Sequence, residues 1–256
     1  MSRTALIIGA SRGLGLGLVK TLLADGWQVT ATVRNPQSAE ALKALGKVRI
    51  EKLDIDDQQA VLMLSQQLKD EVFDLLFVNA GVKGPEVQTP NGGATLAEVG
   101  QLFFTNAVAP INLAQRFVGQ IRPDTGVLAF MSSVLGSVTM PDAPELALYK
   151  ASKAALNSMT NSFVTQLGET GLTVLSMHPG WVKTDMGGEG ADIDVDTSTR
   201  GLVDQVNAYV GKGGHHFINY KGFALSGRDG LAHDGILIDT SHLASPATLD
   251  QQTGQH

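Results

Sequence analysis

The chain has 256 residues, of which 43% are hydrophobic and 17% charged, with no cysteine and a formal net charge of −6. The missing cysteines exclude disulfide scaffolds, thiolate zinc sites, iron–sulfur clusters and cysteine nucleophiles. The acidic balance argues against a surface that neutralises phosphate backbones, so we expect no nucleic-acid partner.

The first residues contain an apolar run of only about five residues, shorter than the core of a signal peptide. No later stretch reaches the roughly 18 apolar residues that a membrane span needs, so we expect no membrane association. A cytoplasmic protein is the resulting expectation, and the missing cysteines agree with a reducing compartment.

Short apolar runs rich in β-branched residues alternate along the chain with longer segments of helical periodicity. Strands are predicted at Ala5–Ile8, Gln28–Val33, Val48–Leu53, Leu75–Asn79, Val127–Met131, Thr173–His178 and Phe217–Tyr220. Helices are predicted at Leu14–Ala24, Ala39–Leu45, Gln58–Lys69, Leu96–Val118, Leu148–Leu167 and Thr199–Val210. The alternation indicates an α/β fold: one doubly wound Rossmann domain whose seven-stranded, mostly or wholly parallel sheet is covered by helices on both faces.

The alternation stops near residue 221. We therefore expect one nucleotide-binding domain over residues 1–221, with a polar, Gly-rich loop over the substrate at about 184–198, and a C-terminal extension over 222–256 that is partly ordered at most.

A glycine cluster, Gly9-Ala10-Ser11-Arg12-Gly13-Leu14-Gly15, lies between the first predicted strand and the first predicted helix. Glycines allow a tight turn there, and backbone N–H groups at a helix N-terminus bind pyrophosphate. The position predicts a dinucleotide site, and a P-loop is excluded because no Gly-Lys-Ser/Thr closes the cluster.

The end of the second strand of such folds selects between cofactors, since an acid there binds the ribose 2′-hydroxyl and a base accepts a 2′-phosphate. Here the strand ends in Arg34, and Arg12 adds a second guanidinium. The pair favours NADP(H) over NAD(H), the alternative being two solvated surface arginines.

Tyr149 and Lys153 lie four residues apart in a predicted helix, so both project from one face. A neighbouring ammonium would lower the pKa of the phenol and make it a usable acid or base. Ser133 follows the fifth strand, at the carboxyl edge of the sheet where such folds bind ligands.

These features resemble the short-chain dehydrogenase/reductase family, most closely the branch of C-factor and the sniffer-type carbonyl reductases. The matching motifs occur in the family's order: Gly9-x-x-x-Gly13-x-Gly15, Asp54, Asn79-Ala80-Gly81, Asn106, Ser133, Tyr149-x-x-x-Lys153 and Pro179-Gly180.

The resemblance implies an NADP(H)-dependent oxidoreductase that acts on a carbonyl or alcohol substrate. Tyr149 would be the proton donor and acceptor, Ser133 would orient the substrate oxygen, Lys153 would assist Tyr149, and Asn106 would hold a water linked to Lys153. Residues and resemblance together predict a cofactor site of Gly9, Ser11, Arg12, Gly13, Leu14, Gly15, Arg34, Asp54, Ile55, Asn79, Ala80, Gly81, Tyr149, Lys153, Pro179, Gly180, Val182 and Thr184.

Other functions stay open at this stage. A cofactor-binding regulatory protein of the C-factor type with little or no turnover is the main alternative, and an epimerase or dehydratase on the same fold is another. No metal site is expected, because the Asp192–Asp196 run lacks the glycine and glutamate of a calcium loop. A homo-oligomer, dimer or tetramer, is undecided.

Overall fold

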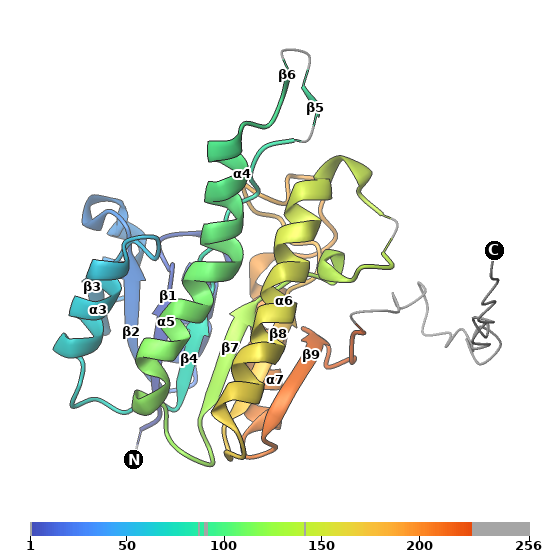
Figure 1. The fold of residues 1–256 in the computed structure, drawn as a ribbon. Coiled ribbons are helices and arrows are strands. Elements are labelled where there is room, and N and C mark those ends of the chain that lie inside the picture. The colour runs from blue at the N-terminus through green and yellow to red at the C-terminus, as the bar shows by residue number, and fades with distance from the viewer. Residues whose placement is uncertain (1, 87, 90–91, 141, 227–256) are drawn as a thin grey trace, which may run out of the picture.

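The computed structural model describes residues 2–86, 88–89, 92–140 and 142–226. Within these residues, seven parallel strands form one sheet in the order β3-β2-β1-β4-β7-β8-β9 (Figure 1). The strands are β1 (Thr4–Ile8), β2 (Gln28–Val33), β3 (Val48–Lys52), β4 (Leu75–Val78), β7 (Val127–Met131), β8 (Thr173–His178) and β9 (Gly214–Asn219). Every pairing between neighbours is parallel, which confirms the predicted architecture.

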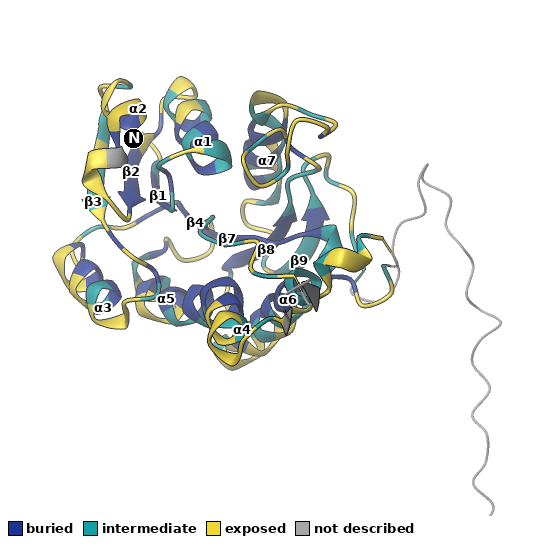
Figure 2. Ribbon diagram, turned by 90° about the horizontal axis from the view of Figure 1, so that it is seen from above, coloured by how far each residue is buried: buried dark blue, intermediate teal, exposed yellow. Residues whose placement is uncertain are grey.

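Helices cover both faces of the sheet (Figure 2). One face carries α1 (Gly13–Ala24), α2 (Glu40–Lys43) and α7 (Val195–Tyr209). The other carries α3 (Gln58–Gln67), α4 (Leu96–Phe103), α5 (Ala109–Phe117) and α6 (Ala147–Leu167).

The central strands are apolar on both faces. Ala5 and Ile7 of β1 belong to the core beneath α1 and α7, whereas Leu6 and Ile8 belong to the core beneath α3, α5 and α6. Successive side chains of a strand point to opposite faces, so β1 contributes to both cores. This double burial explains why the strands are continuous apolar runs without a polar alternation.

The structure departs from the predicted elements in several places. The predicted helix over Leu96–Val118 is split into α4 and α5 by a π-helical turn, Phe104–Val108. A short antiparallel hairpin, β5 (Gln88–Thr89) with β6 (Gly92–Gly93), was not predicted. Strand β9 begins at Gly214, earlier than predicted, because His215 and His216 obscure the apolar pattern.

Helix α7 also begins earlier than predicted, at Val195. The side chain of Asp194 accepts a hydrogen bond from the backbone N–H of Thr197 at 2.7 Å and caps the helix. A capped N-terminus outweighs the weak helix propensity of the β-branched residues that follow it. The acidic run that resembles a calcium loop is thus a helix start, and the described residues contain no cluster of metal-ligating side chains.

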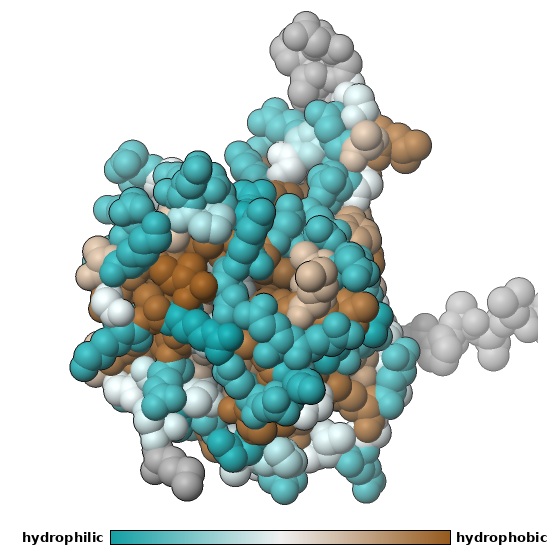
Figure 3. All heavy atoms as spheres, turned by 90° about the vertical axis from the view of Figure 1, so that its left-hand side faces the viewer, coloured by the Kyte–Doolittle hydropathy of each residue, from teal (hydrophilic) through white to brown (hydrophobic). Residues whose placement is uncertain are grey.

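The edge strand β3 carries charged side chains. Arg49 donates to Glu51 at 2.7 Å and also pairs with Glu71. Figure 3 shows the face that bears β3, where hydrophilic side chains surround smaller hydrophobic areas. Charged side chains on an edge discourage pairing with another chain.

At the other edge of the sheet the chain turns back after β9. Leu225 N donates to Phe217 O at 2.7 Å, and Ala224 pairs antiparallel with Ile218. The first residues of the predicted extension therefore pack against β9, whereas residues 227–256 lie outside the described residues. No helix in the described part of the chain is long and apolar enough to cross a membrane.

Candidate active site

The glycine turn connects β1 to α1 at the carboxyl edge of the sheet. Gly9 and Gly13 have φ angles of 83° and 54°, which side chains rarely adopt. A Cβ on Gly15 would lie 2.0 Å from the carbonyl oxygen of Gly9. Thr32 Oγ1 accepts from Gly9 N at 3.0 Å, and Asn79 Nδ2 donates to Gly9 O at 2.7 Å. The turn is therefore built from three neighbouring strands, and glycine is required at each of the three positions.

The N-terminus of α1 is suited to a phosphate. Arg12 at the N-cap makes no capping hydrogen bond through its side chain, and the first turn has no acidic residue. The first backbone N–H groups of a helix have no partner within the helix, and together with the helix dipole they attract an anion. The predicted residues Ser11, Leu14 and their neighbours thus fit the pyrophosphate of a dinucleotide.

The predicted adenosine side of the site lies beyond β2 and β3. Arg34 is exposed at the end of β2, and Asp54 is exposed after β3, where it accepts from Asp56 N at 3.1 Å. The side chain of Ile55 is buried in the core, so a cofactor would meet only its backbone. Burial raises the pKa of Asp56, and the charge of nearby Arg34 opposes that rise.

Tyr149 and Lys153 lie on α6, which packs against the end of β7. The Lys153 side chain is 3% exposed, and its Nζ donates to Met131 O at 2.8 Å. That Nζ lies 5.7 Å from the centroid of the Tyr149 ring. Burial lowers the pKa of Lys153 to about 8, so the side chain still carries its charge at neutral pH. A protonated ammonium therefore sits beside the phenol.

Burial also raises the pKa of Tyr149 to about 12, although a hydrogen bond with Ser133 opposes the rise. The expected fall of this pKa toward neutrality is not seen, because desolvation of the phenolate outweighs the effect of Ser133. Tyr149 consequently holds its proton at neutral pH.

The two adjacent serines differ in their contacts. Ser132 Oγ donates to Asn157 Oδ1 at 2.7 Å and fastens the end of β7 to α6. Ser133 accepts from Leu135 N at 3.1 Å, and its side chain lowers the pKa of the Tyr149 phenol. The second serine is therefore the one that acts on the phenol.

Asn106 lies in the π-helical turn and is fully buried. Its Oδ1 accepts from Val82 N at 2.8 Å, and its Nδ2 donates to Val82 O at 2.8 Å and to Ser152 Oγ at 3.0 Å. A Cβ on Gly81 would lie 3.3 Å from Asn106 Oδ1 and 3.5 Å from Lys153 Nζ. Asn106 thus joins the loop after β4 to α6, and π-helical turns often occur at functional sites.

The segment after β8 brings Pro179, Gly180, Val182 and Thr184 toward the glycine turn. Ser198 Oγ donates to Pro179 O at 2.6 Å, and Gly180 has a φ of 86°. The Thr184 methyl group would lie 3.7 Å from a Cβ on Gly13. The predicted site residues therefore meet at the carboxyl edge of the sheet.

His178 precedes this segment. Burial lowers its pKa to about 4, so the ring is neutral at physiological pH, and its buried Nδ1 has no hydrogen-bond partner among the described residues.

A groove of about 780 Å³ lies at the opposite, amino end of β1 and β2, lined in part by Lys20, Trp27 and Arg49. None of the predicted site residues lines it. It is therefore separate from the candidate active site.

Comparison with known proteins agrees with this geometry. A family model described as short chain dehydrogenase matches residues 3–192. The chain belongs to this family. The chain is thus an oxidoreductase of the short-chain dehydrogenase/reductase family, which confirms the resemblance seen in the sequence.

Individual relatives fall in the expected branch. A crystal structure of a carbonyl reductase from Pseudomonas aeruginosa in complex with NADP is 37% identical, with a TM-score of 0.81 over 88% of this chain and 99% of that chain. The carbonyl reductase Sniffer of D. melanogaster is 32% identical, with a TM-score of 0.78 over 88% of this chain and 100% of that chain. C-signal of Myxococcus xanthus is 32% identical over 58% of this chain and 89% of its own length.

Sequence reasoning missed several residues that position this short-chain dehydrogenase's active site. Thr32 supports the glycine turn, Ser198 holds Pro179, and Asp56 accepts from Gln101 Nε2 and Thr105 Oγ1 at 2.6 and 2.8 Å. Thr32 is a polar residue that breaks the apolar pattern of an otherwise buried strand, and that break was a usable signal. The other contacts join segments far apart in the chain, so no local pattern shows them.

Proposed function

We propose that the chain is an NADP(H)-dependent carbonyl reductase in which Tyr149 gives a proton to the substrate oxygen. The observation that carries this proposal is the placement of the Lys153 Nζ, 5.7 Å from the centroid of the Tyr149 ring, together with Ser133, whose side chain acts on the pKa of the phenol. A group that holds its proton at neutral pH is suited to donate it when a carbonyl is reduced.

Ser133, Tyr149 and Lys153 would each have a separate role in the reduction. The cofactor, when bound, supplies the hydride. Ser133 would orient the carbonyl oxygen toward the hydroxyl of Tyr149, which releases its proton to that oxygen. The phenolate that remains would be stabilised by Ser133 and by the Lys153 ammonium, which are fixed before the reaction.

Asn106 would complete the proton path. Both N–H donors of its side chain are already used by Val82 and Ser152. A water that links Lys153 to solvent would therefore bind to the backbone of the π-helical turn, where the irregular helix leaves carbonyl groups less well paired.

We also propose that the chain prefers NADP(H). Arg34 is exposed after β2, and no acidic residue stands beside it in the sequence. A guanidinium can bind a phosphate dianion through two N–H groups. The solved Pseudomonas carbonyl reductase holds NADP and supports this choice.

The substrate would be an uncharged, largely apolar carbonyl compound. Val138 follows Ser133 in the chain and is 76% exposed, while Trp181 and Met186 follow Gly180 and are 54% and 47% exposed. Large exposed apolar side chains in loops at an active site suit an apolar ligand.

Turnover of NADPH with a panel of aldehydes and ketones tests the proposal. Tyr149→Phe should reduce kcat by at least about a thousandfold, because a general acid and its hydrogen bond are both lost, while NADPH binding changes less than about threefold. Retained turnover by Tyr149→Phe would remove this residue as the proton donor. Tight NADPH binding without turnover on any carbonyl compound would favour a regulatory protein.

A further inference from the structure

The loop between β8 and α7 is held together by backbone hydrogen bonds within the loop. Its two arms are joined where Asp192 N and Ile193 N donate to Trp181 O, and where Lys183 N donates to Ile193 O at 2.9 Å. Its tip is a turn in which Gly188 N donates to Thr184 O at 2.8 Å. The tip is therefore held in a defined conformation.

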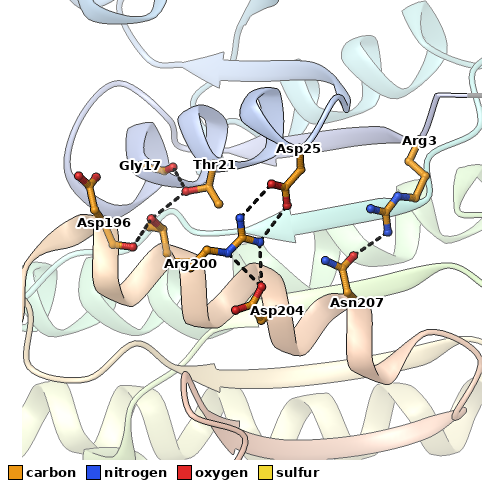
Figure 4. Close-up of polar contacts among 9 residues, drawn as sticks. Arg3, Gly17, Thr21, Asp25, Asp196, Arg200, Asp204 and Asn207 are labelled. Carbon is orange, nitrogen blue, oxygen red and sulfur yellow. Dashed lines mark hydrogen bonds and ion pairs between the residues drawn. The ribbon is translucent and has the colours of Figure 1, made fainter.

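The end of this loop is fixed to the phosphate-binding helix. Gly17 of α1 lies so close to α7 that a Cβ there would be 2.4 Å from Val195 Cγ1. Arg200 donates to both carboxylate oxygens of Asp25, at 2.9 and 2.8 Å, and pairs with Asp204 (Figure 4). The helices α1 and α7 are thus joined along their length.

At the other end of α1, an ion pair joins the tip to the residue before the helix. Arg12 Nη1 donates to Asp185 Oδ2 at 2.6 Å, and the two side chains are 73% and 79% exposed. Arg12 is the guanidinium within the glycine turn, and Asp185 directly follows Thr184. The pair is weak because water competes for both groups.

We propose that Asp185 is a specificity-determining residue, which competes with the 2′-phosphate of the cofactor for Arg12. This inference rests on the proposed function. Arg12 cannot fully serve a carboxylate and a phosphate dianion at once, and the two anions would repel each other across it. Binding of a 2′-phosphorylated cofactor therefore has to break this ion pair, whereas a cofactor without that phosphate leaves it intact.

Asp185→Asn tests this inference, because asparagine has the same size and no charge. Dissociation constants for NADPH and NADH are measured by nicotinamide fluorescence at low salt. The variant should bind NADPH about threefold to tenfold more tightly, from the lost ion pair and the lost repulsion, and NADH within about twofold of the unsubstituted protein. Glu189→Gln removes the same charge from the same loop without touching Arg12 and is the matched control; it should change neither constant more than about twofold.

A double-mutant cycle makes the test specific. In an Arg12→Gln background, Asp185→Asn should change NADPH binding less than about twofold, because the group that the two anions share is gone. Unchanged or weaker NADPH binding by Asp185→Asn, or an effect that persists without Arg12, would overturn the competition while leaving the proposed function intact. Failure of the unsubstituted protein to bind either cofactor would overturn both.

Discussion

Replacement of Lys153 by methionine should make the fold more stable at neutral pH while it removes activity. The pKa of Lys153 is lowered by burial from 10.5 to about 8. At 1.36 kcal/mol per pKa unit, holding the charge in the folded chain costs about 3 kcal/mol at pH 7. Methionine has a similar length and carries no charge, and it loses the hydrogen bond to Met131 O, which contributes about 1 kcal/mol. The net expected gain in the free energy of unfolding is about 2 kcal/mol.

The pH dependence has a definite sign. The pKa of Lys153 is lower in the folded chain than in the unfolded chain, so the unfolded chain binds more protons between about pH 8 and 10.5. The stability of the unsubstituted protein therefore rises with pH in this window, by about 2 kcal/mol between pH 7 and 9.5 from this group. The gain in the free energy of unfolding from Lys153→Met should therefore fall by the same amount between pH 7 and 9.5. Tyr149, whose pKa is raised to about 12, affects stability only above its ordinary value near 10.

Urea unfolding of both proteins at pH 7 and pH 9.5, followed by circular dichroism, measures these differences. A Lys153→Met variant less stable than the unsubstituted protein at pH 7 would refute the reasoning. So would a stability difference that is the same at both pH values.

Two further substitutions test the cofactor site. Gly15→Ala puts a Cβ 2.0 Å from Gly9 O, so we expect it to lower the free energy of unfolding by about 1–3 kcal/mol in urea titrations and to weaken NADPH binding more than tenfold. The control is Gly100→Ala in α4, where a Cβ meets nothing within 4 Å, and it should be neutral or stabilising by about 1 kcal/mol. Equal effects of the two substitutions would refute the role of the turn. Arg34→Ala should weaken NADPH binding about tenfold to a hundredfold in fluorescence titrations and leave NADH binding nearly unchanged. Arg116→Ala, which also removes an exposed arginine, is the control. An equal loss of affinity for both cofactors would exclude a contact between Arg34 and the 2′-phosphate.

The central part of the fold could be predicted from the sequence because its signals are local. Buried parallel strands are continuous apolar runs, and glycine or an acidic residue marks most of the junctions. Helix Gln58–Gln67, for example, begins directly after Asp57, whose side chain caps it. The order of motifs along the chain then placed Ser133, Tyr149 and Lys153 at one edge of the sheet.

The features that sequence reasoning missed depend on contacts between distant segments. The π-helical turn at Phe104–Val108 lies inside a predicted continuous helix, and Asn106 within it bonds to both Val82 and Ser152. The raised pKa of Tyr149 depends on how deeply the ring is buried, which spacing alone does not fix. The pair of Arg12 and Asp185 joins residues that are 173 positions apart.

The most direct test of the central claim is to follow the hydride. The unsubstituted protein is incubated with an aromatic ketone and with NADPH that carries deuterium at both hydrogen positions of C4 of the nicotinamide, and the alcohol is analysed by mass spectrometry. We expect one deuterium on the carbinol carbon of the product, formed at a rate that falls at least about a thousandfold in Tyr149→Phe. An alcohol without deuterium, or the same rate of labelled product in both proteins, would contradict reduction assisted by Tyr149.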